Sequence, residues 1–153
     1  MTDWQTKKLG DIGVFTKGAG IPKDSAQSGE LPAVRYGELY TSFDVFVKNT
    51  KSHIDQETAS ASVKIKKGDI LFAGSGETID EIGKSAVYQL DSEGYAGGDI
   101  VILRPDASQD SSFLGYALNS EMARRELRKI GQGQSVVHVY RKDLETLSLA
   151  LPE

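Results

Sequence analysis

Cysteine is absent from this chain of 153 residues, and histidine occurs only twice, at His53 and His138. Without cysteine, the chain can form neither disulfides nor thiolate metal sites. Two histidines that lie far apart in the sequence exclude a three-histidine metal site. A chain of this length buries enough surface to fold without such supports, so we expect no metal and no cofactor bound by the chain itself.

Long apolar runs are missing as well. No segment approaches the roughly 20 apolar residues that a membrane-spanning helix needs. The polar start, Met1 to Lys8, has neither the apolar segment nor the cleavage site of an export signal. We therefore expect no membrane association and a cytoplasmic setting.

An excess of positive charge is also lacking. Lysine and arginine number 18 against 22 acidic residues, a net charge of −4, which argues against a non-specific nucleic-acid binder. The charge is unevenly placed, because residues 69–110 carry a net −7 and residues 121–142 a net +4. A solvated helix face is the simplest interpretation of that basic stretch. The length and the ordinary composition, 39% hydrophobic and 26% charged, indicate one globular domain over residues 1–153.

Short apolar segments bounded by turn residues predict strands. They lie at residues 12–16, 31–36, 44–47, 63–66, 70–73, 83–88 and 100–103, with further candidates at 136–140 and 147–151. The continuous apolar segment 70–73 is typical of a strand buried on both faces.

One long amphipathic helix is predicted over residues 112–130. The apolar and small residues that recur there at steps of three and four are Phe113, Tyr116, Ala117, Ser120, Ala123, Leu127 and Ile130. Glu121 and Arg125 are placed to pair along it. A shorter helix can begin near Ser52, which would cap it. The segregation of strands from helices indicates an α+β fold with a mostly antiparallel or mixed sheet.

Catalytic motifs fail when each is tested against the residues. The loop Gly74-Ser75-Gly76 lacks the third glycine of a dinucleotide fingerprint, because Ile79 stands there. Gly83-Lys84-Ser85 lacks the first glycine of a phosphate loop, because position 78 is Thr78. Ser75 lacks the flanking glycines of a nucleophile elbow. We therefore expect no enzymatic activity, and a hydrolase or nuclease would need a clustered carboxylate pair that the sequence does not reveal.

Several loops combine glycine, small polar residues, basic residues and aromatics. They are Lys17 to Lys23, Arg35 to Gly37, Gly74 to Thr78 and Gly131 to Ser135, the last running on to Lys142. Glycine permits close approach of a ligand to the backbone, cations neutralise phosphates, and Gln, Ser, His and Arg read base edges. Ordinary turns of a loop-rich β domain would look similar, so both interpretations stay open on the residues alone.

A series of motifs in order resembles the target-recognition domain of the specificity subunit of Type I restriction–modification enzymes. The resemblance covers nearly the whole chain. Its parts are Trp4 with residues 8–12, Gly18 to Pro22, Leu31 to Tyr40, Lys67 to Thr78, Ile82 to Ala86, Gly98 to Pro105, Gly131 to His138, Asp143-Leu144 and Leu149 to Pro152.

The resemblance implies a DNA methylase specificity domain-like fold and a recognition role without catalysis. In that family, two such domains each read one half of a split double-stranded DNA sequence. The modification subunit binds S-adenosylmethionine and methylates adenine, and a restriction subunit can join it. Residues 1–153 correspond to one recognition domain, without the spacer helix and the second domain. The acidic loop from Glu77 to Glu81 departs from a DNA-facing surface, since it would repel phosphates.

The motifs also indicate contact residues. We expect Lys17, Lys23, Arg141 and Lys142 to position the protein on phosphates. Groove-facing roles are expected for Arg35, Tyr36, Ser75, Thr78, Gln132, Gln134, Ser135, His138 and Tyr140. Arg124, Arg125 and Arg128 are candidates for contact with DNA or with the modification subunit. The alternative function is a protein-interaction module that docks on a DNA methyltransferase without binding DNA itself.

Overall fold

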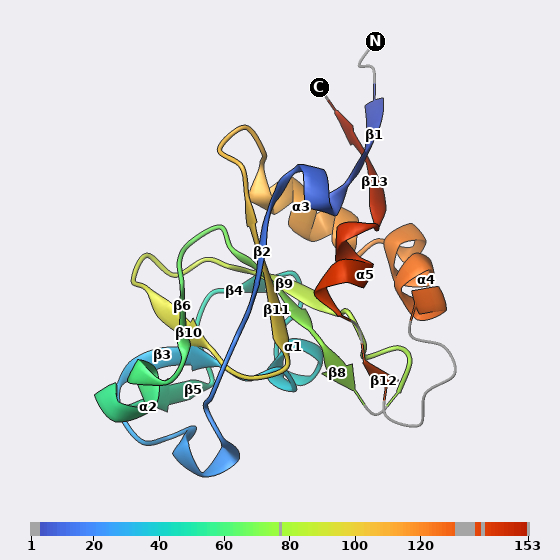
Figure 1. Ribbon diagram of the computed structural model, residues 1–153. Coiled ribbons are helices and arrows are strands. Elements are labelled where there is room, and N and C mark those ends of the chain that lie inside the picture. The colour runs from blue at the N-terminus through green and yellow to red at the C-terminus, as the bar shows by residue number, and fades with distance from the viewer. Residues whose placement is uncertain (1–3, 77, 131–136, 139, 153) are drawn as a thin grey trace.

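A five-stranded mixed sheet forms the centre of the molecule (Figure 1). The computed structural model describes residues 4–76, 78–130, 137–138 and 140–152. The strand order is β2-β11-β7-β9-β4, with β4 parallel to β9 and the other neighbours antiparallel. Its strands are β2 (Gly13–Lys17), β4 (Phe46–Val47), β7 (Ile70–Ala73), β9 (Ser85–Tyr88) and β11 (Ile100–Pro105).

Both faces of this sheet are buried, as the apolar segment 70–73 predicts. In β7, Ile70 and Phe72 belong to one hydrophobic cluster, whereas Leu71 and Ala73 belong to another. Successive side chains of a strand point to opposite faces, so a continuous apolar run supplies two cores at once. All four residues of β7 are fully buried.

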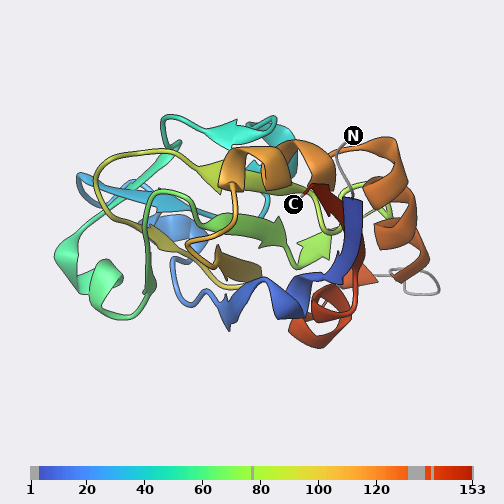
Figure 2. The ribbon, with the colours of Figure 1, turned by 90° about the horizontal axis from the view of Figure 1, so that it is seen from above.

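Helices cover one face of the central sheet. They are α3 (Ser111–Leu118), α4 (Glu121–Ile130) and α5 (Arg141–Glu145). The 3-10 helix η1 (Leu9–Asp11) packs in the same cluster. Figure 2 shows α3 lying across the sheet, where its buried Leu114 and Leu118 share a cluster with Val87 of β9. No helix within the described residues is both long enough and apolar enough to cross a membrane.

A second sheet and a short helix cover the other face. This sheet has the order β5-β3-β10-β6, with β3 and β10 parallel. Its strands are β3 (Leu31–Val34), β5 (Ser52–Ile54), β6 (Val63–Ile65) and β10 (Gly94–Ala96). The short helix is α1 (Glu38–Thr41), whose buried Leu39 joins the cluster between the two sheets, and the other helices of the chain are α2 (Gln56–Ser60) and the 3-10 helix η2 (Lys23–Ser25). Mixed sheets with few helices confirm the predicted α+β class.

Two short ladders join distant parts of the chain. β1 (Trp4–Lys8) pairs antiparallel with β13 (Ser148–Pro152), and both extend away from the rest of the molecule (Figure 1). β8 (Ser75–Gly76) pairs antiparallel with β12 (Val137–His138). The first ladder brings the two ends of the described chain together, and the second connects the Gly74 loop to the segment before α5.

The predicted single helix over residues 112–130 is two helices. The break falls at Asn119 and Ser120, whose side chains bond to nearby backbone instead of continuing the helix. Asn119 Nδ2 donates to the carbonyl of Gly115 at 2.8 Å, and Ser120 Oγ accepts from the Ala123 N–H at 3.3 Å. Such polar side chains favour caps over helix interiors. The recurrence of apolar residues at steps of three and four does not reveal a break of this kind in the helix.

The buried face of α3 also differs from the prediction. Tyr116, expected on the apolar face, is 62% exposed, while Leu114 and Leu118 are buried. Glu121 pairs with Arg128 at 3.0 Å and not with Arg125. The predicted apolar stripe therefore fails at Tyr116 of α3 and holds at Ala123 and Leu127 of α4.

The helix expected to begin at Ser52 starts later. Residues 52–54 form β5, because Ser52 and His53 pair with β3. Asp55 is the cap of α2, and its carboxylate accepts from the Thr58 N–H at 2.8 Å. This carboxylate–amide hydrogen bond lowers the pKa of Asp55.

Tyr88 of β9 predicts a pH dependence of stability. The residue is fully buried, its hydroxyl donates to the Ser92 carbonyl at 3.0 Å, and burial raises its pKa to about 12. The unfolded chain releases this proton near its ordinary value of 10.0, while the folded chain retains it. We therefore expect the free energy of unfolding to fall as the pH rises from about 10 to about 12. Urea unfolding of Tyr88→Phe across the same range should lack this part of the decline, and an identical decline would contradict the assignment.

Candidate nucleic-acid interface

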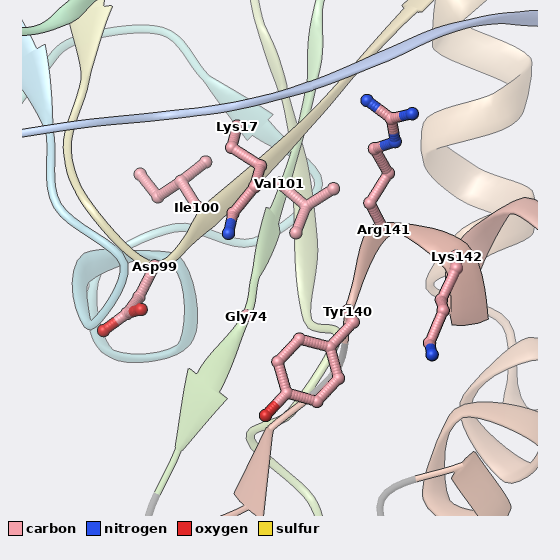
Figure 3. Close-up of a pocket in the computed structure, with 8 residues that line it drawn as sticks. All are labelled: Lys17, Gly74, Asp99, Ile100, Val101, Tyr140, Arg141 and Lys142. Atoms are coloured by element: carbon pink, nitrogen blue, oxygen red, sulfur yellow. The ribbon is translucent and has the colours of Figure 1, made fainter.

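A cavity of about 490 Å³ opens where β2, β11 and α5 meet (Figure 3). Four of the predicted contact residues line it: Lys17 at the end of β2, Tyr140 just before α5, and Arg141 and Lys142 in its first turn. The other lining residues are Gly74, Asp99, Ile100 and Val101. The fold thus brings together residues from the beginning, the middle and the end of the chain.

The cations of this cavity are of two kinds. Lys17 and Lys142 are exposed, and neither ammonium group has a hydrogen-bond or ion-pair partner within the described residues. Arg141 is held in place, because its Nε donates to Glu145 at 3.0 Å and its Nη1 to the Phe15 carbonyl at 3.4 Å. Two unpaired lysines beside a fixed arginine form a surface suited to an anionic ligand.

Local structure at the start of α5 positions these side chains. Asp143 accepts from the Tyr140 N–H at 3.2 Å, which fixes the first turn of the helix. Leu144 is fully buried in the same cluster as Leu9 of η1 and anchors α5 to the body. Tyr140 remains 53% exposed. Its ring therefore adds an accessible aromatic face to the basic surface.

The Gly74 loop and the segment before α5 lie beside each other, as the pairing of Ser75 with His138 in β8 and β12 requires. Ser75 is only 4% exposed. Thr78 closes a turn, since its N–H and hydroxyl both donate to Glu81 Oε1 at 2.9 and 3.1 Å. The predicted residues Gln132, Gln134 and Ser135 lie outside the described residues.

Three further predicted residues do not line the cavity. Lys23 is exposed in η2. Arg35 Nε donates to the Ile21 carbonyl at 3.2 Å, and the Tyr36 ring packs near Tyr40 with 6.4 Å between centroids. Arg35 and Tyr36 therefore make contacts within the fold, beside the turn that carries Gly20 and Ile21.

The basic stretch of α4 binds the acidic loop before β9. Arg124 is 9% exposed, and its guanidinium donates to the Ile82 carbonyl at 3.0 Å and to the Asp80 carbonyl. Burial lowers the pKa of Arg124. Arg128 pairs with Asp80 at 2.9 Å and Glu121 at 3.0 Å. Arg124 is therefore not available to an outside partner, and part of the loop's negative charge is neutralised within the molecule.

Within the residues that the structure describes, no three histidine, aspartate or glutamate side chains are close enough to hold one metal ion. The arrangement that these residues do form is a basic surface with an exposed aromatic ring, which binds charge and stacks on flat groups.

Solved structures share this fold at low sequence identity. The S subunit of a Type I restriction–modification system from M. genitalium matches 99% of the chain with a TM-score of 0.67 and 16% identity. The HsdS subunit from Thermoanaerobacter tengcongensis matches 97% with a TM-score of 0.67 and 20% identity. A structure described as the basis of complex assembly and conformational transition of the type I R-M system matches 97% with a TM-score of 0.62 and 18% identity.

The chain spans about a third of the length of those solved chains, 35%, 33% and 34% in the same order. A search of curated proteins finds no significant match. The family model of the Type I restriction modification DNA specificity domain matches residues 1–153. The chain therefore belongs to the Type I restriction modification DNA specificity domain family.

Proposed function

We propose that this chain recognises one half-site of a double-stranded DNA sequence, as a specificity component of a Type I restriction–modification system. The observation that carries the proposal is the cavity, where two exposed lysines and an exposed tyrosine meet in a chain of a DNA specificity family. Lys17 and Lys142 neutralise phosphates and set the position of the duplex. Tyr140 and the neighbouring β8–β12 ladder then face a groove.

The proposed partners follow from the family. The chain directs a modification subunit, which binds S-adenosylmethionine, and a restriction subunit to the chosen sequence, and it performs no reaction itself. Support comes from the family model and from the solved structure that is described in terms of complex assembly of the type I R-M system. Recognition without chemistry fits a basic surface that offers positioning groups.

Removal of a cavity lysine should weaken binding to all DNA duplexes, whatever their base sequence. Lys142→Ala and Lys17→Ala each remove one phosphate contact, so the slope of log affinity against log salt concentration should fall by about one unit. Fluorescence polarisation with a labelled duplex over a series of salt concentrations measures this slope. Lys67→Ala is the matched control, because Lys67 lies at the opposite end of β7 from Gly74 and pairs with exposed Asp91. An unchanged slope in both cavity variants would remove these lysines from the phosphate contacts.

The second candidate function is docking on a methyltransferase without DNA binding. The exposed apolar side chains of Trp4, Tyr116 and Met122 favour it, at 55%, 62% and 76% exposure. Isolated exposed apolar residues are common on protein surfaces, so this observation carries less weight than the cavity. The same polarisation experiment distinguishes the two functions, because a docking module should show no salt-dependent binding to any duplex.

A further inference from the structure

Asp99 adds an acidic residue to the lining of the cavity, with its carboxylate directed away from the cations (Figure 3). The residue is exposed, and its side chain has no hydrogen-bond or ion-pair partner within the described part of the chain. Figure 3 shows it on one side of Gly74, with Tyr140 and Lys142 on the other side. An acidic side chain repels phosphates. If this surface binds DNA, we therefore expect Asp99 to contact a part of the DNA other than the phosphates.

The backbone around Asp99 is fixed from three directions. The Asp99 carbonyl accepts from the Gly74 N–H at 2.7 Å, the preceding Gly98 N–H donates to the Gly20 carbonyl at 3.0 Å, and the following Ile100 is fully buried. Asp99 itself has a φ of 62°, a left-handed conformation that few residues other than glycine, asparagine and aspartate adopt. The carboxylate is therefore presented from a defined position at the start of β11.

We propose that Asp99 determines specificity by accepting a hydrogen bond from the N4 amino group of a cytosine in the major groove. An ionised carboxylate can only accept, and cytosine N4 is the donor that aspartate and glutamate side chains read there. Lys17 and Lys142 hold the phosphates on the same surface, which brings the base edges within reach of Asp99. This inference rests on the proposed DNA recognition and adds the base that is read.

The proposal predicts effects of opposite sign on the two kinds of binding. Asp99→Asn removes the charge, and asparagine retains the left-handed backbone. On non-specific duplexes this variant should bind about twofold tighter, because repulsion between carboxylate and phosphates is lost. On the preferred duplex it should bind about tenfold more weakly, because the amide oxygen is a weaker acceptor than a carboxylate and the amide also presents an NH2 donor, which suits adenine rather than cytosine. A residue that only supports the fold would lower both affinities together.

The first experiment selects preferred sequences from a randomised duplex library with the 153-residue chain, Asp99→Asn and Asp99→Gly. We expect the wild-type preference for cytosine to disappear at one position in Asp99→Gly and to shift towards adenine there in Asp99→Asn. Asp106→Asn is the matched control, because Asp106 is an exposed carboxylate just past the other end of β11. Equal thermal stability of all four proteins shows that the fold is intact. Identical preferences of the wild type and both Asp99 variants would overturn the inference, as would loss at a position other than cytosine.

The second experiment replaces the selected cytosine with pyrimidin-2-one, which lacks the amino group. The wild type should lose about tenfold in affinity on this duplex, whereas Asp99→Gly, which has no side-chain acceptor, should lose nothing further. A full additional loss in the variant would overturn the inference but leave DNA recognition intact. If the wild type binds no duplex in a salt-dependent way, the proposed function itself fails.

Discussion

Gly18→Ala should destabilise the chain by about 3 kcal/mol or more, because a Cβ there has no space. A methyl group on Gly18 would collide with the Gly97 carbonyl and lie 2.8 Å from the Ala96 carbonyl. Both obstacles are backbone, and the Gly18 N–H already donates to the Ile100 carbonyl at 2.8 Å. The end of β2 would have to move away from the turn between β10 and β11. Urea unfolding followed by circular dichroism measures the loss.

Gly37→Ala is the matched control for this substitution. Gly37 has an ordinary helical φ of −64°, and the nearest atom to its added Cβ is the Tyr40 hydroxyl oxygen at 3.6 Å. Alanine there should be neutral or stabilising by about 0.5 kcal/mol, because it restricts the unfolded chain without strain. Similar unfolding free energies for the two variants would contradict the close approach at Gly18. Because the displaced turn also carries Asp99, Gly18→Ala should reduce sequence preference in DNA binding as well.

Arg124→Met should cost about 3 kcal/mol, since it leaves two carbonyls without their donor. Methionine fills much of the space of the arginine stem, so the loss reports the guanidinium and not a cavity. The Ile82 and Asp80 carbonyls would lose their donors from α4, and the loop before β9 would open more often. Chemical unfolding measures the total effect, and hydrogen exchange of the amides at residues 78–84 locates it.

The neighbouring arginine provides the comparison. Arg125 is exposed on the same helix, and Arg125→Met removes an equal charge, so its effect should stay within about 0.5 kcal/mol. If the two variants unfold at the same urea concentration, the buried contacts of Arg124 contribute little. If only Arg124→Met is destabilised, Arg124 stabilises the fold through its buried hydrogen bonds and not through its charge alone.

Strands marked by apolar side chains over four or more residues could be predicted from the sequence, whereas exposed or very short strands could not. The segment 70–73 reveals itself because every side chain is apolar and the fold buries all four. β1 has five exposed residues and is a strand only because β13 pairs with it from the other end of the chain. β10 is three residues long, too short for any periodicity to register.

The basic residues of the candidate site could be predicted from the sequence, but their arrangement in space could not. Lys17 and Lys142 stand out as charges near glycine, yet only the fold places them on one cavity. Arg124 resembles its exposed neighbours in sequence and differs in burial. Asp99 escaped the prediction because an acidic residue is ordinarily counted against DNA binding. The residues alone leave a ligand site and an ordinary turn both open for the loop of Gly18, and in the structure the space at Gly18 is taken by another loop of the same chain.

The ladder between β1 and β13 also has a consequence for protein engineering. Trp4 lies opposite Pro152, so the chain enters and leaves the described domain at one point. A module with adjoining ends can be inserted into a surface loop of a host protein without forcing the edges of that loop apart. The same geometry permits a short linker to close the ends and new ends to be opened elsewhere. This domain is therefore suited to transplantation as a unit, with the proposed DNA-binding surface moved intact.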